Sequence, residues 1–216
     1  NPAMLFLMFE LYSDFAYRFM EYVGRLFIAL HDEDMKIVMY ENLVDEIGAG
    51  MNNEAKSSWL TQHGELYRQF IHSLRSTKQY LDNRIELKLG DIETASREIS
   101  KKFYNAHATI IDDSDDLQSF AAFSTIECWV TDLYSFWKDS ITRVINQHDC
   151  IDMRTIDLHC VCDKEHSAAL DNILRMKIGV DNSALHKVYS GIIKGMAASE
   201  QLFSDIHHEI IMLTSE

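Results

Sequence analysis

Residues 159–166 read HCVCDKEH, a stretch with two histidines seven positions apart and an aspartate between them. On a helix that turns about 100° per residue, Asp163 lies about 40° from His159, and His166 lies about 20° from it in the other direction. The three side chains therefore point toward the same neighbour. Imidazole and carboxylate groups suit iron, manganese or zinc, but two nitrogens and one oxygen do not fill an octahedral site. Further ligands would have to come from other helices.

This spacing alone does not decide whether the residues bind a metal, because a pair of histidines on one helix face is also common on solvated surfaces. A second signal comes from Glu127, which falls in the middle of an apolar stripe. An unpaired buried carboxylate is so costly that such a group is protonated, ion-paired or bound to a metal. Two interpretations of Glu127 therefore remain: it binds a metal, or it is paired in the interior with an arginine or a tyrosine. The apolar residues within about 60° of Glu127 on the helical wheel are Phe120, Phe123, Val130 and Tyr134.

The composition of the chain predicts an all-α protein. Of its 216 residues, 47% are hydrophobic, which is enough for one sizeable core and favours a single domain over residues 1–216. One proline, Pro2, and eight glycines provide far fewer turn residues than a many-stranded sheet requires. We therefore expect a bundle of about seven helices.

Apolar periodicity and helix-ending residues divide the chain into these helices. Gly48 suits the end of the second helix, Gly90 the end of a short piece after the third, and Gly179 the end of the helix with the opening motif. Asp91 is expected to cap the helix that follows Gly90, and the acidic run 112–116 to supply the next cap. The expected ranges are about 4–30, 33–47, from within 51–58 to 78, 80–88, 91–110, 117–148, 153–177 and from 182 or 183 almost to the C-terminus.

Charge and cysteine content narrow the expected partners. Acidic residues outnumber basic ones 34 to 20, for a net charge of −14 without any Lys/Arg-rich run, so neither nucleic acid nor an anionic membrane is expected. Charged residues interrupt the apolar opening segment, which predicts a buried amphipathic helix and neither a signal peptide nor a membrane span. Four cysteines without a secretory signal indicate a cytoplasmic, reducing setting.

These residues resemble a known family, the heme oxygenase-like diiron oxidases, which are related to the thiaminase II (TenA-like) and pyrroloquinoline quinone synthase folds. In that family a late core helix has His-x3-Asp-x2-His, matched by His159, Asp163 and His166, and a lone helix-borne glutamate stands about thirty residues earlier, matched by Glu127. The ferritin-like alternative uses Glu-x-x-His on two helices. That motif is absent from this sequence, so the ferritin-like architecture is disfavoured.

The first half of the chain also resembles the family, in ENLVDEIGAG at 41–50 followed by HGELYRQF at 63–70. The resemblance implies that Glu46 and His63 are the ligands from this half. Sixteen residues separate them, more than the family pattern leads us to expect, so MNNEAKSS at 51–58 reads as an insertion. Glu41, Glu21 and Glu54 remain alternatives to Glu46.

The resemblance implies a helical bundle with two iron ions, or manganese, between its central helices. It implies O2 as co-substrate and oxidation of a small organic molecule, with a homodimer as one possible assembly. Glu127 is expected to bridge the two metals. Glu46 and His63 would hold one of them, while the sequence does not apportion the ligands of the 159–166 motif.

Three other functions stay open at this point. One is a metal-free hydrolase of aminopyrimidines, of the thiaminase II type, in which Cys128 as nucleophile or a pocket carboxylate would act on the substrate. Another is heme binding through a histidine such as His31, and a third is a non-catalytic helical interaction protein with a vestigial site. Cys160 and Cys162 lie on diverging helix faces and are not expected to be ligands, and the histidine pair 207–208 is expected to be solvated.

Overall fold

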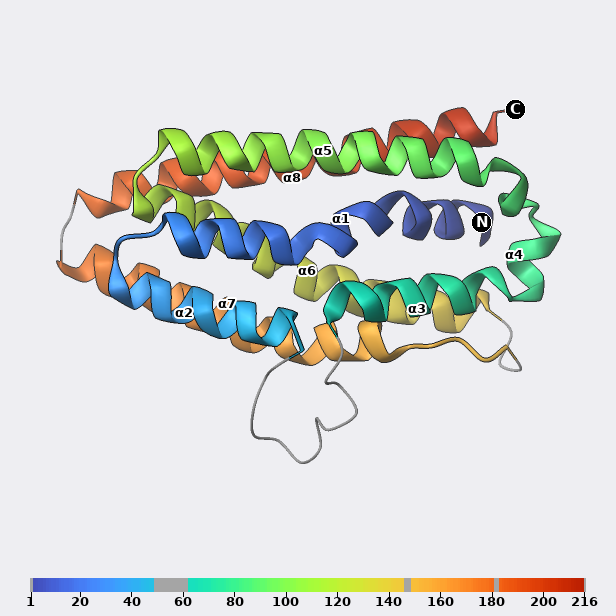
Figure 1. Ribbon diagram of the computed structural model, residues 1–216, viewed down its shortest axis with the longest axis horizontal. Coiled ribbons are helices and arrows are strands. Elements are labelled where there is room, and N and C mark those ends of the chain that lie inside the picture. Colours follow the sequence, from blue (N-terminus) through green and yellow to red (C-terminus); the bar gives the residue numbers. More distant parts are fainter. Residues whose placement is uncertain (1, 49–61, 146–148, 181–182, 216) are drawn as a thin grey trace.

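The computed structural model describes residues 2–48, 62–145, 149–180 and 183–215 (Figure 1). All regular structure in these ranges is helical, which confirms the all-α prediction. The expected start of the third helix within 51–58 lies outside the described residues, as does Glu54. The elements are α1 (Pro2–Ala29), α2 (Glu33–Glu46), α3 (His63–Arg75), α4 (Lys78–Asp82), the 3-10 helix η2 (Ile85–Lys88), α5 (Leu89–Asp113), α6 (Asp116–Val144), α7 (Arg154–Val180) and α8 (Ala184–Thr214).

Short polar side chains begin several of these helices. Asp32 accepts a hydrogen bond from the Met35 backbone N–H at 3.2 Å, and Asp115 accepts one from Gln118 at 3.0 Å. Each satisfies a backbone donor that the first helical turn leaves without a partner. The expectation that the acidic run 112–116 caps the next helix is therefore confirmed at Asp115.

Three expectations for the segment from residue 80 to 91 were wrong. The expected helix over 80–88 is divided into α4 and η2, because Arg84 adopts a left-handed backbone conformation with φ 54° between them. Gly90 does not end a helix, and Asp91 does not cap one, because α5 already begins at Leu89. A glycine inside a helix costs only about 1 kcal/mol relative to alanine, which the packing of α5 can offset.

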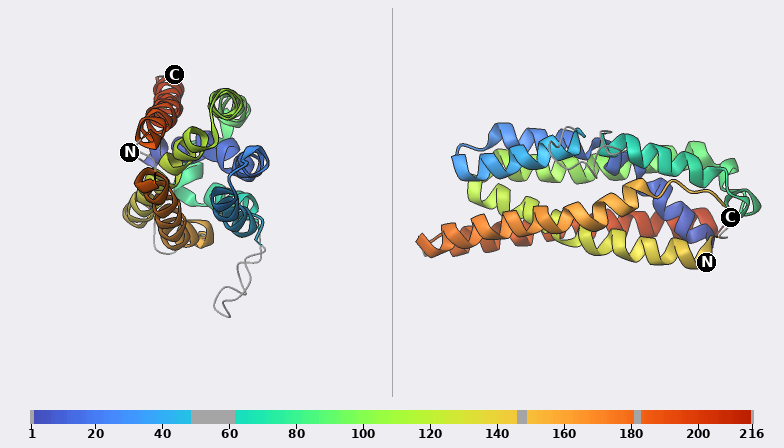
Figure 2. Two further views of the ribbon diagram at one scale, coloured as in Figure 1. Left: turned by 90° about the vertical axis from the view of Figure 1, so that its left-hand side faces the viewer. Right: turned by 90° about the horizontal axis from the view of Figure 1, so that it is seen from below.

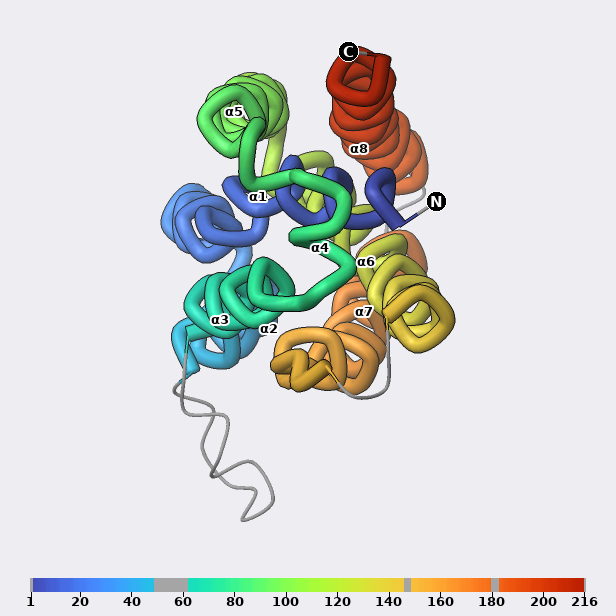
Figure 3. Tube along the Cα trace, turned by 90° about the vertical axis from the view of Figure 1, so that its right-hand side faces the viewer, coloured from blue at the N-terminus to red at the C-terminus, as the bar shows by residue number. Residues whose placement is uncertain are grey.

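Helix α1 runs through the middle of the bundle. Its long neighbours lie nearly parallel to the long axis of the molecule (Figure 1), and the end-on views show α1 surrounded by α5, α3, α6 and α8 (Figures 2 and 3). It contains a buried carboxylate, Glu10, which accepts hydrogen bonds from Arg75 at 2.8 and 2.7 Å and from the Tyr80 hydroxyl at 2.7 Å. The expected buried amphipathic helix is therefore present. No described helix combines the length and apolar character that crossing a bilayer would demand.

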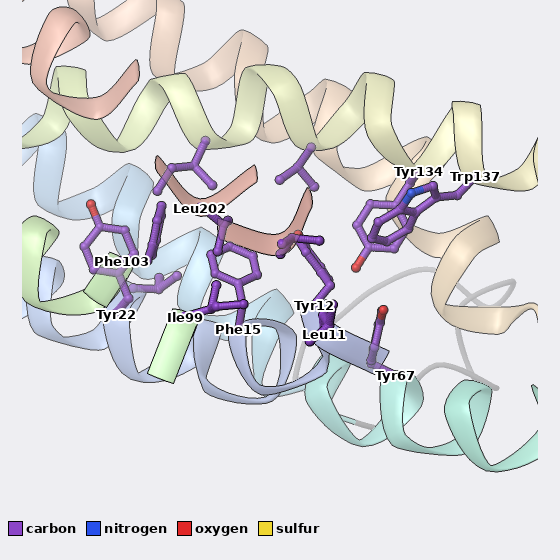
Figure 4. Packing of buried hydrophobic residues seen from close by; sticks show 14 of the residues in the cluster. Leu11, Tyr12, Phe15, Tyr22, Tyr67, Ile99, Phe103, Tyr134, Trp137 and Leu202 are labelled. Atoms are coloured by element: carbon purple, nitrogen blue, oxygen red, sulfur yellow. The ribbon is translucent and has the colours of Figure 1, made fainter. Parts of the chain in front are cut away.

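Small residues allow α8 to approach α6 closely. A Cβ atom at Gly195 would lie 2.5 Å from the Ala122 carbonyl oxygen, and one at Gly191 would overlap the backbone of α6 still more severely. On the opposite side of α6, large aromatic side chains fill the core. Figure 4 shows Tyr134 and Trp137 of α6 packed against Tyr12 of α1, and the rings of Tyr12 and Trp137 meet edge to face at 4.9 Å. This aromatic core adjoins the site described next.

Candidate metal centre

The six residues expected as ligands meet in two groups in the interior. One group is Glu46, His63 and His159, and in it one potential ligand atom from each residue lies within 4.8 Å of the others. The other group is Glu127, Asp163 and His166, with the same spacing. All six side chains are nearly inaccessible, with exposed fractions between 2% and 8%. They come from the end of α2, the start of α3, the middle of α6 and successive turns of α7.

The first group combines one carboxylate with two imidazoles. His63 Nδ1 lies 3.1 Å from Glu46 Oε1, and the rings of His63 and His159 are 5.0 Å apart. Burial alone would raise the pKa of Glu46, but His63 and the other nearby imidazoles lower it. Burial, together with the charge of His63, lowers the pKa of His159 to about 4. At neutral pH Glu46 is thus ionised and His159 is neutral, the forms that bind a metal ion.

Neighbouring groups fix the orientation of His159. Its Nδ1 lies 2.7 Å from the backbone carbonyl oxygen of Thr155, one helical turn earlier. A carbonyl only accepts, so Nδ1 donates and the lone pair of the neutral ring is on Nε2. The Tyr134 ring stacks on the imidazole at 4.2 Å with 10° between the planes. These two contacts leave Nε2 as the nitrogen available to a metal.

The second group combines two carboxylates with one imidazole. His166 Nδ1 lies 3.7 Å from Glu127 Oε2, and its Nε2 lies 3.0 Å from Asp45 Oδ2. Burial and the charge of Glu127 raise the pKa of Asp163 well above its usual range. Burial alone would lower the pKa of His166, but Asp45 and Glu127 raise it to about 11. In the metal-free protein, the protons on Asp163 and His166 therefore offset the negative charge that a bound cation would otherwise balance.

The two groups are adjacent. The charge of Glu46 contributes to the raised pKa of both Asp163 and His166, although it is not the largest cause at either. Residues of both groups also line one cavity, in which the centre of a water-sized molecule can occupy about 20 Å³. That volume suits one or two molecules the size of water or O2. The remaining walls are apolar or aromatic: Tyr12, Phe15, Ala16, Phe19, Tyr67, Val130 and Tyr134.

Buried atoms without partners indicate that these groups fit a metal. Asp163 Oδ2 and His166 Nδ1 are buried and make no hydrogen bond, and His63 Nδ1, although 3.1 Å from Glu46 Oε1, is not aligned to form one. Buried polar atoms in proteins are normally paired, and an unsatisfied one costs about 1–3 kcal/mol. Cations within the two groups would satisfy all three atoms. Three imidazoles and three carboxylates form a donor set that suits iron, manganese or zinc.

The two alternatives for the first-half carboxylate that lie in the described residues, Glu21 and Glu41, do not reach the site. Glu21 is exposed and pairs with Arg18 at 3.0 Å, and Glu41 is exposed on α2. Of the cysteines expected not to be ligands, Cys160 is half-buried and Cys162 is buried, and neither belongs to a ligand group in the described part of the chain.

Three further expectations concern residues outside the cavity. Cys128, the nucleophile considered for a metal-free hydrolase, is exposed and lines an open groove between α6, α7 and α8, outside the cavity. The side chain of His31 is 92% exposed beside Asp116, away from the cavity. The expected solvation of the pair 207–208 is confirmed, because both side chains are exposed.

Asp45 is a polar contact of the site that sequence reasoning missed. It precedes Glu46 directly, and consecutive helix residues diverge by about 100°, so helical geometry alone places the two on different faces. Only the packing of α7 beside α2 brings His166 to Asp45. Its signal in the sequence was no more than a second acid in the run ENLVDEIGAG.

The fold and the site together define a class, the helical-bundle proteins with a buried, carboxylate- and histidine-rich candidate metal centre. A comparison with protein families places the chain within it. The family model for an iron-containing redox enzyme, of the heme oxygenase-like kind, matches residues 9–200, and the chain belongs to this family. The match extends beyond residues 41–166, which contain the motifs that resemble the family. No curated protein matches the sequence significantly.

Proposed function

We propose that this protein is a non-heme diiron oxidase or oxygenase that uses O2 to oxidise a small organic substrate. The observation that supports this most directly is the pair of adjacent buried groups, each with one potential ligand atom per residue within 4.8 Å of the others. Membership of an iron-containing redox enzyme family favours iron over zinc. A structural role for so many buried, partly unpaired polar groups would require a large stability cost without return.

In this proposal Glu46, His63 and His159 hold one iron, and Glu127, Asp163 and His166 hold the other. The bound irons would supply electrons to O2. Three carboxylates against two divalent cations leave a net charge of about +1, which is far less costly to bury than three carboxylates alone. The expectation that Glu127 bridges the metals remains part of the proposal, supported by its position in a cavity lined by both groups.

The surrounding side chains would exclude water and orient the ligands. Thr155 holds His159 through its backbone carbonyl, and the stacked ring of Tyr134 shields one face of the same imidazole. Aromatic side chains from α1 and α3 form further parts of the wall, with Tyr67 held by its hydrogen bond to the Phe9 carbonyl at 3.0 Å. A dry, rigid wall of this kind confines a reactive centre and limits side reactions.

The cavity also bears on the substrate. Its described lining contains no lysine or arginine, so no fixed cation there would pair with a carboxylate or phosphate. The centre of a water-sized molecule can occupy only about 20 Å³ in it, so the cavity admits only a small or slender part of a molecule. We therefore propose that the part of the substrate entering this cavity is small and not anionic.

The test is anaerobic Fe(II) loading followed by exposure to O2. We expect two irons per chain after removal of unbound metal, and O2 uptake that depends on that iron. His63→Ala should bind one iron, whereas His72→Ala, an exposed histidine on the same helix α3, should bind two. Fewer than one iron in the unsubstituted protein, without O2 uptake, would instead support a non-catalytic interaction protein.

A further inference from the structure

Two consecutive residues at the end of α2 reach different metal groups. Glu46 belongs to the first group, while the preceding residue, Asp45, lies against the imidazole of the second, with Oδ2 at 3.0 Å from His166 Nε2. The Asp45 side chain is 30% exposed, whereas that of His166 is 8% exposed. Asp45 therefore stands on the solvent side of the ring, and Glu127 faces the ring from the interior, 3.7 Å from Nδ1.

We propose that Asp45 is a positioning residue that holds His166 with Nδ1 directed at the second metal and thereby sets the affinity of that site alone. The inference rests on the proposed function, because it assumes that Glu127, Asp163 and His166 bind a metal. An imidazole that binds a metal has one nitrogen for the metal and one N–H for a hydrogen bond. Asp45 accepts that N–H from Nε2, so Nδ1 is the nitrogen that would give up its proton and bind the metal.

The burial of the two ring nitrogens supports this assignment. His166 Nδ1 is buried without a hydrogen-bond partner, as a metal-binding atom is in a metal-free structure. Its Nε2, in contrast, is already engaged by Asp45. A carboxylate on the far nitrogen of a ligating histidine fixes the ring and raises its basicity, and removing such a partner typically weakens metal binding about 10–100-fold.

In the first group, a backbone contact and not a carboxylate orients the histidine ring. His159 donates from Nδ1 to the backbone carbonyl of Thr155 at 2.7 Å, a contact that no side-chain substitution removes. The orientation of its ring therefore does not depend on Asp45. A change at Asp45 should weaken the second metal and leave the first one in place, which a general loss of stability would not do.

The experiment compares Asp45→Ala, Asp45→Asn and a matched control, Glu41→Ala, which removes an exposed carboxylate one turn earlier on α2. Zinc, which is diamagnetic and does not react with O2, is titrated into each full-length protein, and the affinity of each equivalent is measured. We expect Asp45→Ala to weaken the second equivalent about 10–100-fold without changing the first. Asp45→Asn keeps an oxygen that accepts from Nε2 and should bind both equivalents within a few-fold of the unsubstituted protein.

A second measurement determines which nitrogen of the His166 ring carries the proton and which binds the metal. Long-range 15N–1H NMR of the zinc-loaded proteins should place the proton of His166 on Nε2 and the metal on Nδ1, in the unsubstituted protein and in Asp45→Asn. The proposal fails if Asp45→Ala binds both equivalents as tightly as the control does. It also fails if Asp45→Asn loses as much affinity as Asp45→Ala, because Asp45 would then act through its charge or as a ligand. An unsubstituted protein that binds fewer than two metals would refute the proposed function itself.

Discussion

The substitution Asp163→Val should separate the stability of the fold from the stability that metal confers. Asp163 is 2% exposed, and its Oδ2 is buried without a hydrogen-bond partner. Valine and aspartate have similar helix propensities, so the change at this point of α7 acts through burial. Without metal, removing the unpaired oxygen should stabilise the protein by about 1–3 kcal/mol, the usual cost of such an atom.

With metal present, the effect of the substitution should change. A ligand at a hundred times its dissociation constant stabilises the folded state by about 2.7 kcal/mol per site. The unsubstituted protein gains this at both groups, whereas Asp163→Val keeps only the group of Glu46, His63 and His159. The advantage of the variant should therefore fall by about 2.7 kcal/mol, which cancels or reverses it.

Urea unfolding, first with a chelator and then with Mn(II) or anaerobic Fe(II), measures both quantities. Asp171→Val is the matched control, because Asp171 lies two turns later on α7, is exposed and pairs with Arg175. It should gain no stability in chelator and should respond fully to metal. The reasoning is refuted if Asp163→Val is less stable than the unsubstituted protein in chelator, or if metal stabilises both proteins equally.

Three further predictions concern other parts of the molecule. Burial lowers the pKa of His107 from 6.5 to about 3, so the unfolded chain binds the proton more readily and the free energy of unfolding falls by about 1.36 kcal/mol per pH unit below pH 6.5. Urea unfolding should show a smaller slope when His107 and its hydrogen-bonded partner Tyr22 are both replaced by Phe. An unchanged slope would contradict this prediction. Gly191→Ala should cost about 1–3 kcal/mol in thermal unfolding because its Cβ would overlap α6, whereas Gly90→Ala, with open space around it, should gain about 0.5–1 kcal/mol. Cys128→Ala should leave iron-dependent O2 uptake unchanged because the thiol lies outside the cavity, and a loss of uptake would contradict that placement.

The part of the site on α7 could be predicted because it obeys a local rule. His159, Asp163 and His166 share one helix face, so their convergence follows from 3.6 residues per turn. Glu127 could be found in the same way, as a carboxylate in an apolar stripe. Glu46 and His63 were identified through the family resemblance, because their approach depends on how α2 and α3 pack against α7.

The division of the ligands into two groups could not be predicted. His159 faces Glu46 and His63, while His166, on the same face of α7 two turns later, faces Glu127. Which partner each ring meets depends on the positions of the neighbouring helices, and a helical wheel contains no such information. The same holds for Asp45, whose contact with His166 links two helices far apart in sequence. The break at Arg84 depends on a left-handed residue that is itself neither glycine nor asparagine, the types that favour this conformation.

Helix α1 supplies a wall of the cavity through Tyr12, Phe15, Ala16 and Phe19 but no residue of either ligand group. The residues that would bind metal and those that shape the space beside it are thus on separate helices. A larger side chain at Ala16, or a smaller one at Phe19, would change which molecules fit while every ligand atom stays in place. Chemistry and selectivity can therefore diverge independently in this protein, and α1 is the place to alter the second without the first.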